Sequence, residues 1–114
     1  MASPAEAAVQ RQLEAYNARD LERFLAEFSP QVRVYRPPAT APAIEGIDAL
    51  RAFYAAERFN RPALHAELLG RMVLGNKVVD HERISGVREA PFEMVVVYQV
   101  AEGRIAALWT FDGA

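Results

Sequence analysis

The sequence contains no cysteine and only two histidines, His65 and His81. A chain without thiols cannot form disulfides, use a catalytic thiolate or build a thiolate metal site. Two histidines also leave few ligands for a metal centre of another kind. We therefore expect a protein that works without a cofactor.

Long apolar runs are missing too. No segment approaches the roughly 18 consecutive apolar residues that a membrane-spanning helix needs. The first residues, MASPAEAAVQRQ, lack the basic region followed by an apolar run that marks a secretory signal. We expect a cytoplasmic protein with no membrane partner.

The chain also lacks a large excess of positive or negative charge. Thirteen Lys and Arg residues are interspersed with fifteen Asp and Glu residues, which leaves a formal net charge of −2. Without a basic run there is no electrostatic footprint for nucleic acid. The 114 residues, 52% of them hydrophobic, suffice for one core, and we expect a single domain over residues 1–114.

The first half of the chain has the apolar periodicity of helices, interrupted once. Ala5 to Tyr16 and the segment LERFLAEF place apolar residues on one stripe, and Asp20 is a suitable N-cap for the second helix. QVRVYRP alternates like a strand. The proline-rich segment 37–46 predicts an irregular loop, and helical spacing resumes at IDALRAFYAAERF.

The second half has the character of a sheet. We predict strands over 63–74, 77–85, 92–100 and 104–112, with a hairpin turn at Gly75-Asn76. The order of elements indicates an α+β fold, in which a curved antiparallel or mixed β-sheet wraps around three N-terminal helices.

Four consecutive ionisable residues, Asp80 to Arg83, stand inside one of these strands. Alternation puts His81 and Arg83 on one face and Asp80 and Glu82 on the other. Simple antiparallel pairing predicts Arg83 opposite Glu93, with Asp112 opposite Glu93 on its other side. We predict that the face with His81 lines a pocket, and that Asp80 and Glu82 point outward. The pocket face then comprises His81, Arg83, Glu93, Val95, Val97, Leu108, Thr110 and Asp112.

The opposite face of the last strands is also apolar. It comprises Met94, Val96, Tyr98, Val100, Ile105, Trp109 and Phe111. Because an apolar surface of this size favours a partner, we expect a homodimer formed through the sheet. A one-residue bulge would exchange the two faces.

Together these segments resemble the nuclear transport factor 2-like superfamily over nearly the whole chain, and most closely its SnoaL-like, ketosteroid isomerase-like branch. The resemblance is carried by the link NARD, the EGI before the third helix, the hairpin through LGNKVVDHERISG and the GRI that opens the last strand. It implies a cone-shaped, cystatin-like roll with an internal ligand pocket. Because the fold hosts isomerases, cyclases, hydrolases, dehydratases and binders, it does not fix the activity.

Residue by residue, the resemblance excludes two activities. Where ketosteroid isomerases keep their aspartate base, this chain has Arg36, which cannot abstract a proton. Their oxyanion tyrosine aligns with Gln12, one turn from Tyr16, and their acidic donor aligns near Glu93. We expect steroid isomerisation to be absent or marginal. The aspartates of the related epoxide hydrolases are also missing, since Thr110 stands where the last of them would be.

The resemblance to dehydratases and cyclases suggests that His81 pairs with Asp112 or Glu93. We therefore expect a pocket for a small apolar carbonyl compound and, if the protein is an enzyme, cofactor-free proton transfer of the isomerase or cyclase type. The predicted catalytic residues are His81, Glu93 and Asp112. The predicted ligand-binding residues are Tyr16, Arg36, Arg83, Val95, Val97, Leu108 and Thr110.

Structural roles remain open for the same residues. His81 also fits a strand histidine that only hydrogen-bonds its neighbours, and Arg83 with Glu93 also fits a cross-strand salt bridge. Tyr16 lies on the apolar stripe of its helix and fits a core position. The alternative function is a non-catalytic ligand-binding or dimerisation module of the same fold.

Overall fold

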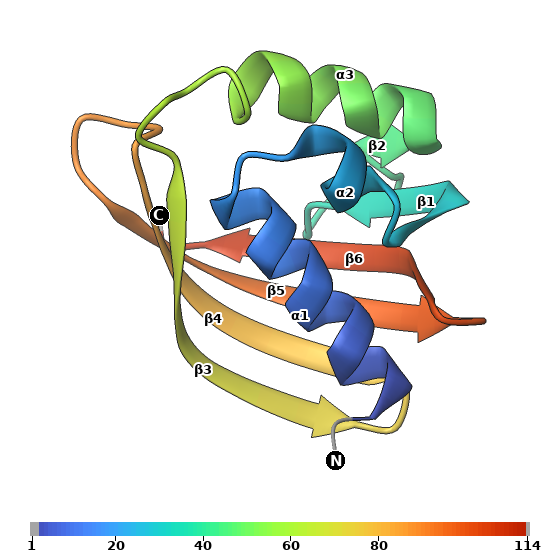
Figure 1. The fold of residues 1–114 in the computed structure, drawn as a ribbon. Coiled ribbons are helices and arrows are strands. Elements are labelled where there is room, and N and C mark those ends of the chain that lie inside the picture. Colours follow the sequence, from blue (N-terminus) through green and yellow to red (C-terminus); the bar gives the residue numbers. More distant parts are fainter. Residues whose placement is uncertain (1–2, 114) are drawn as a thin grey trace.

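The computed structural model describes residues 3–113 and shows three helices on one side of a curved six-stranded sheet (Figure 1). The predicted α+β class is confirmed. The elements are α1 (Pro4–Asn17), α2 (Leu21–Leu25), β1 (Phe28–Tyr35), β2 (Ile44–Glu45), α3 (Ile47–Glu57), β3 (His65–Leu74), β4 (Lys77–Ser85), β5 (Phe92–Ala101) and β6 (Arg104–Asp112).

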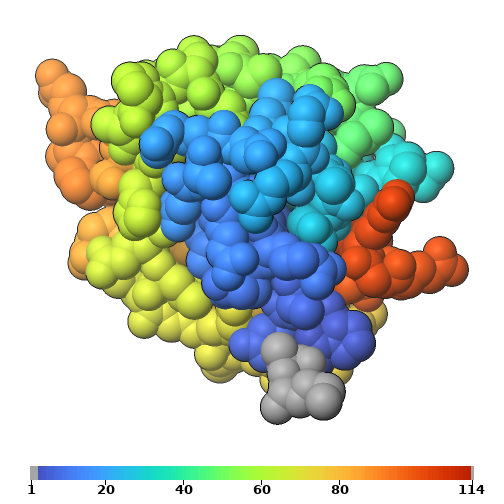
Figure 2. Space-filling model, in the orientation of Figure 1, coloured from blue at the N-terminus to red at the C-terminus, as the bar shows by residue number. Residues whose placement is uncertain are grey.

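The strand order is β2-β1-β6-β5-β4-β3, and the sheet is mixed. Strand β1 runs parallel to β6, while the other neighbouring strands are antiparallel. In Figure 1 the long strands β3 to β6 bend around α1, so the sheet has a concave face toward the helices and a convex face away from them. Figure 2 shows α1 and α2 packed in front of the concave face.

Side chains cap both of the first two helices, and the cap at Asp20 is the one that the sequence predicts. Ser3 accepts the Glu6 N–H at the start of α1, and Asp20 Oδ1 accepts the Arg23 N–H at 3.1 Å at the start of α2. Helix α2 is shorter than predicted, because it ends at Leu25 and the strand begins at Phe28.

The proline-rich segment is more ordered than expected at one point. Its end forms β2, which pairs antiparallel with β1 through Val34 and Ile44. The prediction of an irregular loop was therefore wrong for Ile44–Glu45. Burial of Ile44 in the core offsets the poor strand propensity around it.

The connections between the long strands are close to those predicted. Leu74 pairs with Lys77 around the Gly75-Asn76 turn. Gly86 ends β4 with φ +83°, and a Cβ atom there would lie 2.2 Å from the Ala63 carbonyl oxygen. Only glycine fits this close backbone approach.

The register between β4 and β5 agrees with the prediction, since Arg83 lies opposite Glu93 and His81 lies opposite Val95. The register of β6 does not. Val100 pairs with Ile105, whereas Gln99 pairs with Ala107, so β6 carries one extra residue at this point. Asp112 therefore lies opposite Met94 and not opposite Glu93. Beyond the bulge, each β6 side chain therefore points to the face opposite to the one predicted from the sequence.

The prediction of which face is internal was wrong. The helices pack on the face that carries Asp80 and Glu82, and both side chains are buried there, whereas His81 and Arg83 are exposed. The reason lies in the rest of that face, which supplies most of the sheet's buried apolar side chains. Its buried residues on β4 to β6 are Val78, Asp80, Glu82, Ile84, Val96, Tyr98, Val100, Ile105 and Leu108.

The predicted dimer surface changes accordingly. Val96, Tyr98, Val100 and Ile105 belong to the core and are covered by the helices, so they cannot form an outer contact. Trp109 lies on the convex face, where its ring stacks on Tyr35. Phe111 is opposite Val95 on that face and is 43% exposed.

No helix among residues 3–113 combines the length and the apolar character that crossing a membrane would require.

Candidate functional site

A cavity of about 50 Å³ lies between the helices and the concave face of the sheet. It has room for a few water molecules or for one functional group of a ligand. Most of its wall is apolar, as is usual for small-molecule sites. Its polar lining residues are Gln12, Tyr16, Tyr54, Arg58, Glu82, Tyr98 and Thr110.

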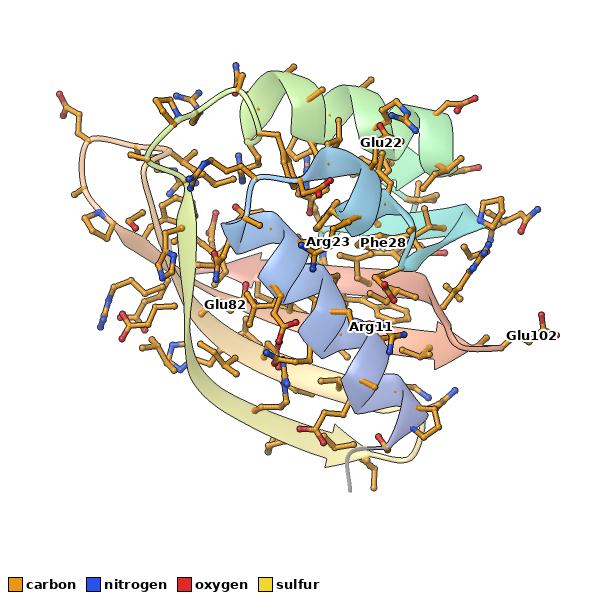
Figure 3. All side chains as sticks on the ribbon, in the orientation of Figure 1. Arg11, Glu22, Arg23, Phe28, Glu82 and Glu102 are labelled. Carbon is orange, nitrogen blue, oxygen red and sulfur yellow. The ribbon has the colours of Figure 1, made fainter. Side chains whose placement is uncertain are left out.

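Glu82 is the acidic group of this cavity. Strand alternation points it inward between Asp80 and Ile84, and Figure 3 shows it on the side of the sheet that faces α1. Its exposed fraction is 6%, and it forms no hydrogen bond or ion pair with any residue of the range 3–113. The carboxyl group therefore reaches the cavity without a partner.

The surroundings of Glu82 raise its pKa from 4.5 to about 7. Burial is the main cause, because it penalises the charged carboxylate. The negative charge of Asp80 raises the pKa further, and the positive charge of Arg71 opposes the rise. Glu82 therefore changes protonation near neutral pH, which suits a group that accepts and returns a proton.

Asp80 has no exposed surface but, unlike Glu82, it is fully paired. Arg71 on β3 donates to both of its carboxylate oxygens, from Nε at 2.7 Å and from Nη2 at 3.0 Å. Arg71 Nη1 also donates to Gln10 Oε1 at 2.9 Å, and the Glu6 carboxylate lies 3.7 Å away. The hydrogen bond to Asp80 is the main cause that raises the pKa of Arg71. This cluster joins α1 to the sheet beside the cavity.

Three tyrosine hydroxyl groups surround the cavity. Tyr98 accepts a hydrogen bond from Gln12 Nε2 at 3.2 Å, and the Tyr16 and Tyr54 rings meet edge to face with centroids 6.5 Å apart. Burial raises the pKa of all three hydroxyls, and the charge of Glu82 raises it further. At neutral pH they remain protonated and can donate hydrogen bonds.

An open vestibule of about 530 Å³ adjoins the cavity. The two share four lining residues, namely Tyr54, Arg58, Met94 and Thr110. The vestibule is lined by three arginines and two acidic residues, which are Arg36, Arg58, Arg88, Glu57 and Asp112. A ligand that occupied both spaces would meet Glu82 at its inner end and guanidinium groups at its outer end.

Five of the predicted site residues lie elsewhere, on the convex face. His81 Nε2 contacts Glu93 Oε1 at 2.5 Å, and Arg83 pairs with Glu67 at 2.9 Å and not with Glu93. Val95 and Val97 lie on the same face, opposite Phe111 and Trp109. None of the five lines the cavity or the vestibule, so their predicted place in the pocket was wrong.

The other predicted residues do line the two spaces. Tyr16, Leu108 and Thr110 line the cavity, while Arg36 and Asp112 line the vestibule. The structure brings them together with Glu82, which the sequence prediction had placed outside. Within residues 3–113 no group of three or more His, Asp or Glu side chains is placed to hold a metal ion.

Glu82, Tyr54 and Arg58 are the residues that the sequence prediction missed. A signal for Glu82 existed, because Val78 and Ile84 share its strand parity and mark that face as apolar. Arg58 immediately follows α3, and no pattern in the sequence relates the end of that helix to the sheet.

Known proteins show the same fold. A protein of cystatin fold from Novosphingobium aromaticivorans superposes with a TM-score of 0.82 at 20% identity, covering 97% of this chain and 99% of that one. A candidate ketosteroid isomerase from Kribbella flavida gives 0.83 at 17% identity, covering 97% and 78%. A candidate SnoaL-like polyketide cyclase from Jannaschia sp. gives 0.81 at 19% identity, covering 96% and 85%.

No curated protein shows significant similarity to the chain. Its sequence does match the family described as the SnoaL-like domain over residues 9–108, a range that includes Glu82, Tyr98 and Leu108. That match extends over most of the 114 residues. The chain therefore belongs to the SnoaL-like domain family.

Proposed function

We propose that this protein is a cofactor-independent enzyme of the isomerase or cyclase type, which transfers a proton within a small carbonyl compound. The observation that carries the proposal is Glu82, a buried carboxyl group without a partner at the wall of a cavity. An acid–base catalyst works best when its pKa lies near the working pH. The pKa of about 7 supports this role for Glu82.

The reaction follows from the groups around the cavity. Ionised Glu82 accepts a proton from the carbon next to the ligand's carbonyl group, and the electron pair of that C–H bond moves onto the carbonyl oxygen. Hydrogen bonds from Tyr16 or Tyr54 stabilise the resulting enolate. In an isomerisation, protonated Glu82 then returns the proton to another carbon of an enolate that is conjugated with a C=C bond. In a cyclisation, the enolate carbon forms a bond to a second carbonyl carbon of the same molecule, the π pair of that carbonyl moves onto its oxygen, and this oxygen takes the proton from Glu82. Atoms and charge balance in both outcomes.

The site differs from the one expected from the resemblance. His81 and Glu93, proposed as catalytic from the sequence, are hydrogen-bonded to each other on the convex face, so Glu82 replaces them in the proposal. Asp112 remains within the vestibule, where it lies 3.8 Å from Arg88. Its position suits contact with a ligand better than proton transfer in the inner cavity.

Steroid isomerisation remains an activity that we expect to be absent or marginal. Arg36 lines the vestibule and cannot act as a base, and the inner cavity of about 50 Å³ is too small for a steroid ring system. Robust conversion of a β,γ-unsaturated 3-ketosteroid by the purified protein would contradict this expectation.

A non-catalytic binding module is the alternative function. A computationally designed 17-OHP binder shares the fold with a TM-score of 0.79 at 19% identity, covering 96% of this chain and 92% of that one. That protein was designed for binding. A cavity of this kind therefore does not require chemistry, and the experiment must separate binding from turnover.

Hydrogen–deuterium exchange at carbon provides that separation. Small ketones and oxo acids are incubated with the protein in D₂O, and loss of the proton next to the carbonyl group is followed by NMR. We expect exchange above the buffer rate with the wild type and little with Glu82→Gln, whereas Glu93→Gln on the convex face retains the wild-type rate. A compound that binds in the cavity without exchanging, or equal rates for Glu82→Gln and wild type, would favour the binding module.

A further inference from the structure

The vestibule contains more guanidinium groups than its own carboxylates neutralise. Arg88 lies 3.8 Å from Asp112, and its guanidinium stacks on the Phe92 ring at 3.8 Å, so Arg88 already has partners. Arg36 and Arg58 have no carboxylate within ion-pair distance among residues 3–113. Glu57, the remaining acid of the vestibule, forms no ion pair with either of them.

Arg36 and Arg58 are held around one aromatic ring. The guanidinium carbon of Arg36 lies 5.1 Å from the centroid of Phe53, and that of Arg58 lies 5.6 Å from it. They come from different elements, because Arg36 follows β1 and Arg58 follows α3. Arg58 Nη1 donates to the Glu57 backbone carbonyl oxygen at 3.2 Å. The cation–π contacts restrain both side chains, and the remaining guanidinium N–H groups are donors for a ligand.

Arg58 also links the two spaces, because it lines both the vestibule and the inner cavity. Its guanidinium donates a hydrogen bond to the Tyr16 hydroxyl, which partly opposes the rise that burial causes in the pKa of Tyr16. The rest of the vestibule wall is largely apolar, and includes Val34, Ile44, Phe53, Phe92 and Met94. The vestibule therefore combines an apolar wall with two guanidinium groups that both contact the Phe53 ring.

We infer that the ligand of this site is an amphipathic carboxylic acid whose carboxylate binds Arg36 and Arg58 and whose apolar body packs against Phe53 and Phe92. A planar guanidinium binds a carboxylate through two parallel hydrogen bonds. The placing of the ligand's carbonyl group toward Glu82 rests on the proposed function. The carboxylate site does not, since it depends on the vestibule alone.

A matched pair of ligands tests the inference. Phenylpyruvate is an aromatic oxo acid, and its methyl ester retains the aromatic body and the carbonyl group but lacks the negative charge. Binding of each to the full chain is measured by calorimetry at low salt. We expect the acid to bind at least about 10-fold more tightly than the ester, as loss of charge-assisted hydrogen bonds predicts.

Variants of the vestibule arginines test which residues give the preference for the acid over the ester. Arg36→Met and Arg58→Met should each reduce the preference for the acid by on the order of 10-fold. Arg33→Met, an exposed arginine of β1 outside the vestibule, should leave it unchanged. Because Arg58 also touches Tyr16, Arg36→Met is the decisive variant, and circular dichroism confirms that each variant is folded.

Several results would overturn the inference. Equal binding of acid and ester, no binding of either in the millimolar range, or an unchanged preference in Arg36→Met would each do so. Tighter binding of phenyl phosphate than of phenylpyruvate would reject a carboxylate in favour of a phosphate. Glu82→Gln separates the two proposals, because it should abolish proton exchange while it preserves the preference for the acid.

Discussion

Neighbouring charged residues of strand β4 lie in opposite environments on its two faces. His81 and Arg83 point to the convex face, where each has a carboxylate partner and about half of each side chain is exposed. Asp80 and Glu82 point into the core, where almost no surface remains. Water screens the first pair, but the protein itself must compensate the second.

Asp80 and Glu82, the two inner residues, also differ from each other. Asp80 receives two hydrogen bonds from Arg71, which offsets the cost of burying its charge. Glu82 receives none, and its pKa rises to about 7. Two carboxylates two residues apart on one strand thus have different properties, because only Asp80 is hydrogen-bonded to a cation.

The largest effect is expected at the Arg71–Asp80 pair. Arg71→Met would leave a fully buried carboxylate without its partner and should lower the free energy of unfolding by about 3–5 kcal/mol. Urea unfolding measures this, with Arg83→Met on the convex face as the matched control. A loss below about 1 kcal/mol for Arg71→Met would show that Asp80 is satisfied without it.

Glu82 should make stability depend on pH. Its pKa rises from 4.5 to about 7 on folding, so the folded state binds the proton more tightly. The wild type should therefore lose stability relative to Glu82→Gln as the pH rises from about 4.5 to about 7, by about 3 kcal/mol in total. Thermal or urea unfolding of both proteins across this range measures the difference. A difference that does not change with pH, or that grows in favour of the wild type, would contradict it.

The homodimer through the sheet remains a prediction, with its surface moved to the convex face. There Val79, Val95, Val97, Trp109 and Phe111 form an apolar centre, and Met72 is 68% exposed beside it. The charged residues at its edge already pair among themselves, as His81 does with Glu93, so they would not repel a second copy.

Sedimentation velocity at micromolar concentration tests the dimer. Val95→Glu should shift the protein toward monomer, whereas Ala56→Glu on the exposed side of α3 should not. A wild-type protein that sediments as a monomer at every concentration would contradict the prediction.

The smallest effects are expected at the ion pairs of the convex face. His81→Ala and Arg83→Ala should each change the free energy of unfolding by about 0.5 kcal/mol or less, because both pairs are exposed to water. This revises the expectation from the sequence, in which Arg83 and Glu93 lie opposite each other on the face that lines the pocket. A loss above about 2 kcal/mol in either variant would contradict the prediction and show that these two ion pairs are shielded from water.

The fold could be predicted from the sequence because local signals agree with one another. The Asp20 cap, the Gly75-Asn76 turn and the alternation of β4 all point to elements that the structure contains. Even the register that places Arg83 opposite Glu93 across β4 and β5 could be predicted from the position of the turn between the strands.

The site could not be predicted in the same way. Strand parity groups His81 with Val95 but does not say which group faces the helices, and both faces of β5 are apolar. The extra residue near Ala106 then exchanges the two sets of β6 side chains, so that Leu108 and Thr110 join Glu82 and not His81. No short-range pattern marks this bulge, because Ala106 suits either conformation of the strand.

The pKa of Glu82 is the most direct test of the account. Side-chain carboxyl shifts of ¹³C-labelled glutamate, followed by NMR from about pH 3 to 9, give the titration of each residue, and Glu82→Gln assigns the resonance. The account predicts an apparent pKa of about 7 for Glu82. A value near 4.5 would mean that the carboxylate is solvated or paired in solution, which would contradict its role as the acid–base group of the cavity.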